Sequence, residues 1–223
     1  MQNVMYRILF AVSATIIPMV LSYWIKQRYR NKLLKLQSQQ REFDNSYYHC
    51  MFWTTDNNKC KEHMFNNIEC RNNCSVTYLQ TLLKCLSSSK SSIAMCMYHL
   101  TLKQVADELI KAQRRGITVR IITDYITSRI EHSKMKLLKN THGFDVRTPP
   151  CNDSFMHHKY CLIDAEDADL QKLFLGSLNL TLQGCVANFE FVVITNNPHM
   201  IREYSKEFNV LWNTFEESNV LRL

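Results

Sequence analysis

Hydrophobic and polar positions follow two different periods along the chain from residue 76 onwards. Some segments repeat apolar residues every three or four positions, which predicts amphipathic helices. These helices are expected over 76–86, 102–115, 130–140 and 198–215. Short apolar runs lie between them and predict buried strands. These strands are expected over 91–99, 118–123, 144–147, 159–163, 173–175 and 189–195. The alternation predicts an α/β sandwich in which helices flank a mixed central β-sheet.

The N-terminal part has another pattern, because residues 8–25 form an uncharged and mostly apolar stretch, ILFAVSATIIPMVLSYWI. As a helix this stretch would span ~27 Å, which is close to the hydrocarbon thickness of a bilayer. Its two ends carry Tyr6 and Tyr23-Trp24, and aromatic residues are common at membrane interfaces. We therefore expect a transmembrane anchor over 8–25.

Basic residues are concentrated next to this stretch. Residues 1–35 hold six basic and no acidic residues, and five of the basic ones lie within 26–35. By the positive-inside rule, the chain after the anchor would face the cytosol. A cleaved signal peptide is disfavoured because the basic residues follow the apolar stretch. Such a single-pass anchor suits the outer mitochondrial membrane, with the endoplasmic reticulum as the alternative.

The remaining chain is nearly neutral but unevenly charged. The formal charge of the whole is +7, and most of this excess lies in residues 1–35. Residues 101–150 carry ten Lys or Arg and five Asp or Glu, and residues 151–223 carry five and ten. A basic face built from the middle segment could follow a phosphate backbone. Ordinary solvated helix faces are an equal alternative.

The composition fits one folded domain with an N-terminal appendage. The chain has 223 residues, of which 46% are hydrophobic, enough for a sizeable core. The expected parts are a short segment (1–7), the anchor (8–25), a basic flank with a linker (26–49), a Cys/His-rich segment (50–74) and a catalytic domain (75–223).

The Cys/His-rich segment suggests a metal site. In a cytosolic domain disulfides are disfavoured, and clustered cysteines indicate metal ligands. Cys60 with His63, and Cys70 with Cys74, have the spacing of zinc-ligand pairs, and Cys50 is a fifth candidate. We expect a structural zinc held by Cys50, Cys70 and Cys74, with Cys60 or His63 as the fourth ligand. The alternative is a loop of cysteines without metal.

A candidate phosphate site lies between residues 155 and 190. His157 and Lys159 are two positions apart at the start of an apolar run, so on a strand they would reach the same ligand. Asp164 follows this run, and then come Gly176, Ser177, Asn179 and Glu190. His158 would point to the opposite face, where a structural role is expected.

These residue types suit phosphodiester chemistry. A phosphodiester needs a nucleophile, positive charge on its non-bridging oxygens and a proton for the leaving alkoxide. Histidine can attack or donate the proton near neutral pH, and lysine and asparagine can hold the oxygens. The site would require no catalytic metal.

The pattern His-x-Lys-x4-Asp followed by Gly-Ser-x-Asn resembles the phospholipase D superfamily. His157, Lys159 and Asp164 match its motif, Asn179 matches its downstream segment, and Glu190 matches the acidic residue that commonly follows. The segment between Asp164 and Gly176 is longer than usual and acidic, which we interpret as an enlarged turn.

The chain holds only one such motif, whereas this chemistry uses two imidazoles. The resemblance therefore implies a homodimer in which His157 of both subunits meets across a two-fold axis. One His157 would form a phosphohistidine and the other would donate the proton. Lys159 and Asn179 would bind the oxygens, Glu190 would orient an imidazole, and Asp164 would support the strand.

The anchor, the basic flank, the Cys/His cluster and the single motif together resemble the Zucchini family of mitochondrial phospholipases D, also called mitochondrial cardiolipin hydrolases. The cluster departs from that family's three cysteines and one histidine, because Cys74 stands where the family has the histidine. An all-cysteine site, or one with His63 as the imidazole ligand, would follow.

This resemblance implies an endoribonuclease that cuts single-stranded RNA, the precursors of PIWI-interacting RNAs, at the mitochondrial surface. The alternative is a phospholipase that hydrolyses cardiolipin to phosphatidate by the same chemistry. A narrow basic groove would favour RNA, and a wide apolar one would favour lipid. A membrane-tethered scaffold without activity is a third alternative, but its expected sign, a substituted motif residue, is not found.

Overall fold

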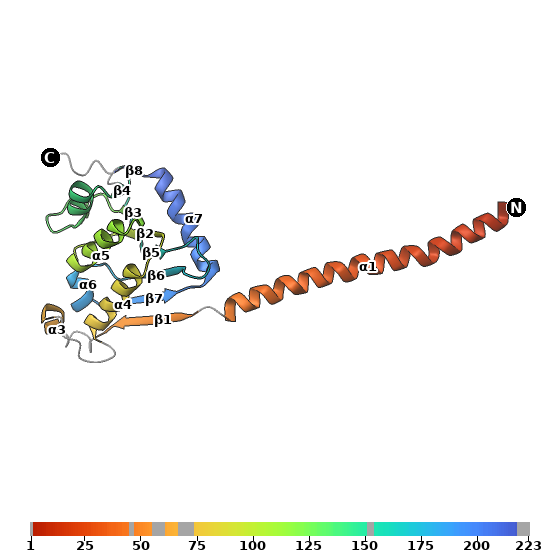
Figure 1. Ribbon diagram of the computed structural model, residues 1–223, viewed down its shortest axis with the longest axis horizontal. Coiled ribbons are helices and arrows are strands. Elements are labelled where there is room, and N and C mark those ends of the chain that lie inside the picture. Colours follow the sequence, from red (N-terminus) through yellow and green to blue (C-terminus); the bar gives the residue numbers. More distant parts are fainter. Residues whose placement is uncertain (1, 45–46, 55–60, 67–73, 151–153, 218–223) are drawn as a thin grey trace. The chain divides into compact units, whose positions relative to one another are not determined.

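The computed structural model describes residues 2–44, 47–54, 61–66, 74–150 and 154–217. The chain divides into two compact units, Met1–Asn45 and Ser46–Leu223. Figure 1 shows the elements of both units.

The first unit is one long helix, α1 (Gln2–Asp44), which contains Pro18. The helix continues through the predicted polar linker, because residues 36–44 are rich in good helix formers and lack glycine and proline. Among the residues that the structure describes, no helix combines the length and the apolarity of a membrane span. The transmembrane anchor predicted over 8–25 is therefore not supported.

The second unit is built on an eight-stranded sheet in the order β1-β7-β6-β5-β2-β3-β4-β8. The strands are β1 (Tyr48–Trp53), β2 (Ser92–Met97), β3 (Thr118–Thr123), β4 (Asp145–Thr148), β5 (Lys159–Ile163), β6 (Lys172–Gly176), β7 (Glu190–Thr195) and β8 (Glu216–Glu217). Neighbours β2 and β3, and β3 and β4, run parallel, and the other pairs are antiparallel. The predicted mixed sheet is confirmed.

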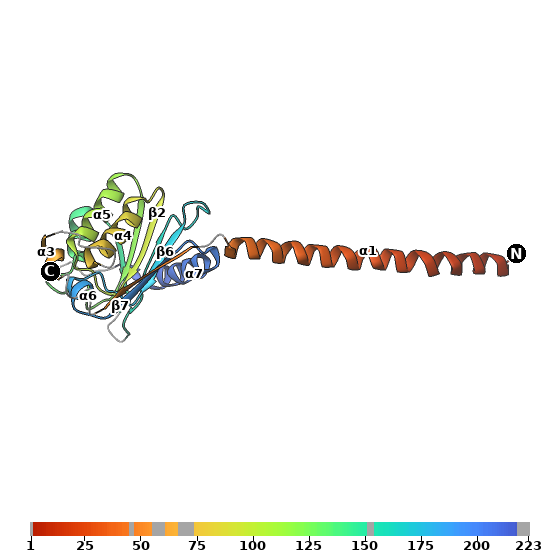
Figure 2. The same cartoon turned by 90° about the horizontal axis from the view of Figure 1, so that it is seen from below.

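Helices cover both faces of this sheet. They are α3 (Lys61–Asn66), α4 (Ser75–Ser87), α5 (Lys103–Arg114), α6 (Leu182–Val186) and α7 (Pro198–Thr214). Figures 1 and 2 show α4 and α5 on one face and α7 on the other. The larger core includes Leu82 of α4 and Leu109 of α5, and the smaller core includes Phe208 and Trp212 of α7. The predicted α/β sandwich is therefore confirmed.

Two of the predicted helix boundaries have a clear local cause. Gly116 follows α5 with a φ of 84°, a left-handed conformation that glycine adopts at helix ends. At the start of α7 the side chain of Asn197 accepts a hydrogen bond from the Met200 amide at 3.0 Å, and Pro198 occupies the first turn.

The helix predicted over 130–140 is wrong in its first half. Residues 125–132 form turns, and a π-helical stretch η1 covers Leu137–Thr141. The side chain of Asp124 accepts hydrogen bonds from the Ile126 and Thr127 amides at 3.0 Å, which stabilises a turn there. The buried apolar residues of this segment, Met135 and Leu138, lie in its helical second half, whereas Ile130 is exposed.

Strand β1 crosses the predicted boundary between the linker and the Cys/His-rich segment. Met51 and Trp53 are buried, and the Trp53 ring lies 4.9 Å from the ring of Tyr78 on α4. The strand is therefore part of the same sandwich, and the folded domain begins before residue 75.

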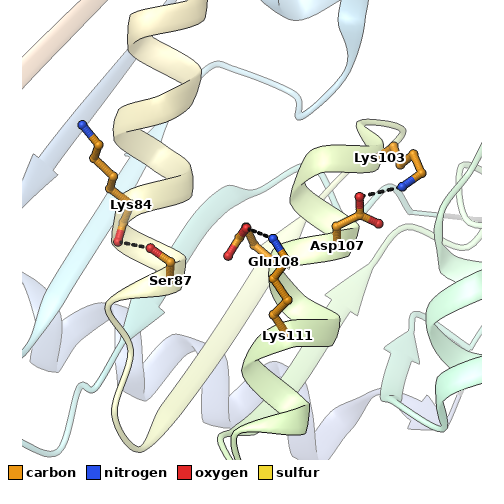
Figure 3. Close-up of polar contacts among 6 residues, drawn as sticks. All are labelled: Lys84, Ser87, Lys103, Asp107, Glu108 and Lys111. Carbon is orange, nitrogen blue, oxygen red and sulfur yellow. Dashed lines mark hydrogen bonds and ion pairs between the residues drawn. The ribbon is translucent and has the colours of Figure 1, made fainter. Parts of the chain in front are cut away.

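The outer surfaces of α4 and α5 carry polar contacts between residues three or four positions apart, shown in Figure 3. Lys103 pairs with Asp107 at 2.6 Å, and Lys111 pairs with Glu108 at 2.8 Å. Such exposed pairs contribute little to stability, and they mark these faces as solvated. The charged residues of α5 therefore form an ordinary solvated helix face, which was the alternative to a basic face that follows a phosphate backbone.

Asp164 ties the end of β5 to the turn before β2. Its carboxylate accepts hydrogen bonds from the amides of Lys90, Ser91 and Ser92 and from the Ser91 hydroxyl, at 2.8 to 3.1 Å. Burial alone would raise the pKa of Asp164, but the hydrogen bonds from Ser92, Ser91 and Lys90 outweigh it and lower the pKa. The contacts match the supporting role expected for this residue.

We predict that Asp164→Asn destabilises the domain by about 2 kcal/mol at neutral pH, because charged acceptors make the stronger hydrogen bonds. Since folding lowers the pKa of Asp164, its contribution is present above the ordinary value of 3.8 and is lost as the pH falls through the folded value. Chemical denaturation of both proteins between pH 3 and 7 measures this difference. Asp169→Asn, in the exposed turn, is the control, and an equal loss in both variants would contradict the assignment.

Candidate active site

The motif residues meet at one edge of the sheet. Strands β2 and β6 end there, and β5 and β7 begin there. Met97 pairs with Lys159 across β2 and β5, and Gly176 pairs with Val192 across β6 and β7. Side chains just beyond these strand ends therefore converge on one place.

His157 and Lys159 both contact one aromatic ring, that of Tyr98. The His157 ring centroid is 4.6 Å from that of Tyr98, and the Lys159 Nζ lies 4.9 Å from the Tyr98 centroid. The Lys159 ammonium also donates a hydrogen bond to the His157 carbonyl oxygen at 2.8 Å. The structure thus brings these two predicted residues together, with Tyr98 as an unpredicted partner.

Burial and charge favour the neutral form of the His157 imidazole. Burial lowers the pKa of His157, the Lys159 ammonium lowers it further, and the Asp124 carboxylate partly offsets both. Burial also lowers the pKa of Lys159, which the Glu190 carboxylate partly restores. A neutral imidazole next to a fixed cation can attack a bound anion.

Glu190 is held by two neighbours at this edge. It accepts hydrogen bonds from the Ser177 hydroxyl and, at 3.0 Å, from the Asn188 side-chain amide. The Ser177 hydroxyl in turn accepts from the Phe191 amide at 3.0 Å. The expected contact of Glu190 with an imidazole is not among the interactions of the described part of this chain.

Gly176 allows this close arrangement of strands. A Cβ atom added there would lie 2.0 Å from the carbonyl oxygen of Phe191, a distance that real side chains do not adopt. Glycine at this position therefore lets β6 approach β7 and positions Ser177 next to Glu190.

Asn179 lies beyond the end of β6 and is half-buried. Its Oδ1 atom is buried and has no hydrogen-bond partner among the residues that the structure describes. The next residue, Leu180, forms a parallel bridge with Leu100, which follows β2. Asn179 is therefore held at the same edge as His157 and Lys159.

The sequence analysis did not identify Asp124, whose carboxylate holds the backbone directly before His157. Asp124 is 1% exposed, and its carboxylate accepts from the Met156 amide at 3.3 Å as well as from Ile126 and Thr127. It thereby fixes the residue before His157. An aspartate directly after the apolar strand 118–123 was the available signal.

His158 lies on the opposite side, as predicted. Its Nε2 is 3.6 Å from the Glu207 Oε1 on α7, and its ring centroid is 5.9 Å from that of Tyr160. These contacts belong to the interface with α7 and separate His158 from the motif.

The structure tests the zinc candidates only in part. Cys60 and Cys70 lie outside the described residues. Among the described residues, no three or more Cys, His, Asp or Glu side chains lie close enough together to hold a metal ion. The Cys74 Sγ lies 3.9 Å from the His63 Nδ1. Cys50 is exposed on β1 and points away from the buried Met51, which shares a core with Cys74. Cys50 and Cys74 are therefore on opposite faces of the sheet.

A family model described as "Cardiolipin synthase, PLD-like domain" matches residues 82–212. This range includes the sheet edge with its His-x-Lys-x4-Asp motif. The chain therefore belongs to the family of phospholipase D-like domains, and the predicted resemblance is confirmed.

Curated relatives carry one shared name. The "Mitochondrial cardiolipin hydrolase" of Danio rerio is 32% identical over 144 residues, which cover 65% of this chain and 61% of the relative. The protein of that name from Homo sapiens is 30% identical over 137 residues, covering 61% and 52%. The matched region thus spans about half to three fifths of these relatives' lengths.

Solved structures of lower identity share the fold. Nuc from Salmonella typhimurium, titled a phospholipase D family member, has a TM-score of 0.61 at 20% identity, over 78% of this chain and 99% of that one. NucT from Helicobacter pylori has a TM-score of 0.61 at 18% identity, over 78% and 100%. In Nuc and NucT, the region that matches this chain therefore makes up almost the whole protein.

We predict that Glu190→Gln lowers the pKa of Lys159 further, because the Glu190 carboxylate is the group that raises it. The ammonium would then lose its proton at a lower pH. A titration of the Lys159 side chain followed by NMR measures the shift. Glu207→Gln, next to His158, is the matched control, and an unchanged Lys159 titration in Glu190→Gln would contradict the prediction.

Proposed function

We propose that the protein is a phosphodiesterase in which His157 attacks phosphorus. The observation that carries this proposal is that the His157 imidazole and the Lys159 ammonium contact the same Tyr98 ring, while the ammonium donates to the His157 carbonyl oxygen. Family membership supports the same chemistry, because the matched residues 82–212 include His157, Lys159 and Asn179.

The reaction proceeds in two steps. A nitrogen of His157 forms a bond to phosphorus while the bond to the leaving oxygen breaks, which gives a phosphohistidine. A second imidazole donates its proton to that oxygen, and it then takes a proton from the water that attacks the phosphohistidine. Lys159 and the Asn179 amide hold the non-bridging oxygens throughout.

A homodimer supplies the second imidazole. His158 faces α7, so it is not available at this edge. A two-fold axis through the edge would bring His157 of the partner subunit to the same phosphate.

The proposed substrate is single-stranded RNA, in the precursors of PIWI-interacting RNAs. Phe155 and Phe189 are 64% and 70% exposed and adjoin the motif, so they can stack on unpaired bases. Cardiolipin is the second candidate, favoured by the names of the relatives. The same two rings could contact acyl chains, so the substrate needs a direct test.

The relatives' names also support a mitochondrial location. We propose attachment of the first unit to the outer membrane, with the second unit in the cytosol. The basic residues within 26–35 and the uncharged stretch 8–25 are the features that favour it.

We further propose a structural zinc held by His63 and Cys74, with Cys60 and Cys70 as the remaining donors. A tetrahedral zinc would hold a sulfur and a nitrogen ligand ~3.6 Å apart, close to the 3.9 Å between Cys74 Sγ and His63 Nδ1. Such an ion would fix α3 against the start of α4.

We predict about one zinc per purified chain, as a closed tetrahedral site would hold. His63→Ala would lose the metal and lower the thermal stability, because it removes a ligand. Mass spectrometry of metal content measures the first effect, and thermal unfolding measures the second. His132→Ala, at an exposed loop position, is the control, and zinc-free wild-type protein would contradict the proposal.

The function is tested with wild-type, His157→Asn and His158→Asn chains. Each is incubated in EDTA with 5′-labelled single-stranded RNA and, in parallel, with cardiolipin vesicles. We expect His157→Asn to lose on the order of 10³-fold in rate, as the loss of a nucleophile does. His158→Asn should keep the rate within about threefold, because its contacts are with α7.

The two substrates separate the candidates. RNA cleavage that leaves new 5′-phosphates supports the nuclease, and phosphatidate without RNA cleavage supports the lipase instead. No product from either substrate would favour the non-catalytic scaffold. Equal loss in both histidine variants would contradict the assignment of His157.

A further inference from the structure

A second histidine, His99, lies beside the candidate active site and has no role in the chemistry above. It follows Tyr98, whose ring contacts His157, and it is half-buried. Its Nε2 atom is buried without a hydrogen-bond partner among the described residues. Burial lowers the pKa of His99, and the Asp124 carboxylate partly offsets this, so the neutral imidazole is favoured. A buried polar atom without a partner costs free energy and requires an explanation.

Asn179 carries the complementary unpaired atom. Its Oδ1 is also buried without a partner within the described parts of the chain. A neutral imidazole with its proton on Nε2 donates one hydrogen bond, and an amide oxygen accepts one. The two unpaired atoms are therefore complementary as donor and acceptor.

The backbone places the two residues side by side. Leu100 and Leu180 form a parallel bridge, and the amides of Thr101 and Leu102 donate to the Leu180 carbonyl at 3.0 and 3.1 Å. Both leucines are 1% exposed in the larger core. Successive side chains in extended backbone alternate, so the residues before them, His99 and Asn179, share the other side of this bridge.

The main chain of Asn179 is fixed, but its amide group is not. A Cβ atom added at Gly184 would lie 2.6 Å from the Asn179 carbonyl oxygen, so α6 packs closely against this backbone. The side-chain amide can rotate about its own bonds, and one hydrogen bond would determine its orientation.

We propose that His99 is a positioning residue for Asn179. Its Nε2–H donates to the Asn179 Oδ1 when substrate is bound, which turns the Asn179 Nδ2 towards a non-bridging phosphate oxygen. The proposal rests on the proposed phosphodiesterase function and adds a residue that the motif does not contain. The His99 imidazole itself touches neither the phosphate nor the leaving group.

The test measures kcat/KM of the full-length chain on bis(p-nitrophenyl) phosphate, a chromogenic phosphodiester. The variants are His99→Gln, His99→Asn, His99→Leu, Asn179→Ala and the double variant His99→Leu/Asn179→Ala. The amide nitrogen of Gln reaches the position of Nε2, whereas that of Asn stops short of it. The Gln and Asn variants are therefore matched in polarity and differ in reach.

We expect His99→Leu and His99→Asn to lower kcat/KM about tenfold, the value of one hydrogen bond in the transition state. His99→Gln should stay within about threefold of wild type. In the Asn179→Ala background, His99→Leu should have no further effect, because residues that act through one interaction are not additive. Thermal unfolding identifies any variant that fails to fold. If His99→Leu is such a variant, the comparison of His99→Gln with His99→Asn tests the role of His99.

Two results would overturn the assignment of His99. One is a His99→Asn rate equal to that of His99→Gln. The other is a His99→Leu substitution that lowers kcat/KM as much in the Asn179→Ala background as in the wild-type chain. The His157→Asn variant shows whether a negative result concerns only the role of His99 or also the proposed phosphodiesterase function. If wild type is inactive, or if His157→Asn is as active as wild type, the phosphodiesterase proposal is itself contradicted, and the role of His99 falls with it.

Discussion

The register of β5 against β2 determines where Lys159 and Asp164 lie. Met97 faces Lys159 in this pairing, and Asp164 at the far end of β5 accepts hydrogen bonds from the turn that precedes β2. A slip of one residue would exchange the two faces of β5, so that Lys159 would point towards α7. The carboxylate of Asp164 opposes such a slip, because it accepts bonds only when the strand ends at that position.

At the candidate site, the surroundings of His157 favour its neutral form, and Lys159 lies next to it. Burial lowers the pKa of both His157 and Lys159, and the carboxylates of Asp124 and Glu190 act against this shift. The two carboxylates act on different groups, since Asp124 raises the pKa of His157 and Glu190 raises that of Lys159. In the proposed mechanism, a single chain supplies one nucleophile and one anion-binding cation, and the second imidazole comes from the partner subunit.

Much of the fold and of the candidate site could be predicted from the sequence, because the residues that indicate them lie close together along the chain. The apolar run of β5 and the residues around it follow a fixed spacing, and both ends of β5 were predicted correctly. The α/β sandwich followed from the alternation of two periods. The predictions that failed depended on particular side-chain contacts or strand pairings that apolar spacing does not reveal. The turns of residues 125–132 depend on the Asp124 side chain, and β1 is a strand because it pairs with β7. Tyr98 and Asp124 are not distinguished by spacing, so only the fold reveals their contacts with the motif.

The zinc candidates and the N-terminal helix show the limit of pattern alone. Spacing paired Cys60 with His63 and Cys70 with Cys74, but it did not indicate that His63 and Cys74 are neighbours in the structure. Residues 36–44 resembled a linker, yet they continue α1 because most of them are good helix formers and none is glycine or proline.

The central claim is that His157 forms a bond to phosphorus. The most direct measurement is rapid acid quenching or alkaline trapping of the full-length chain with a phosphodiester substrate, followed by mass spectrometry of its peptides. The account predicts a phosphoryl adduct on His157 and on no other histidine, and its absence in His157→Asn. An active protein with an adduct on another residue, or with none under conditions where hydrolysis of the adduct is slow, would contradict it.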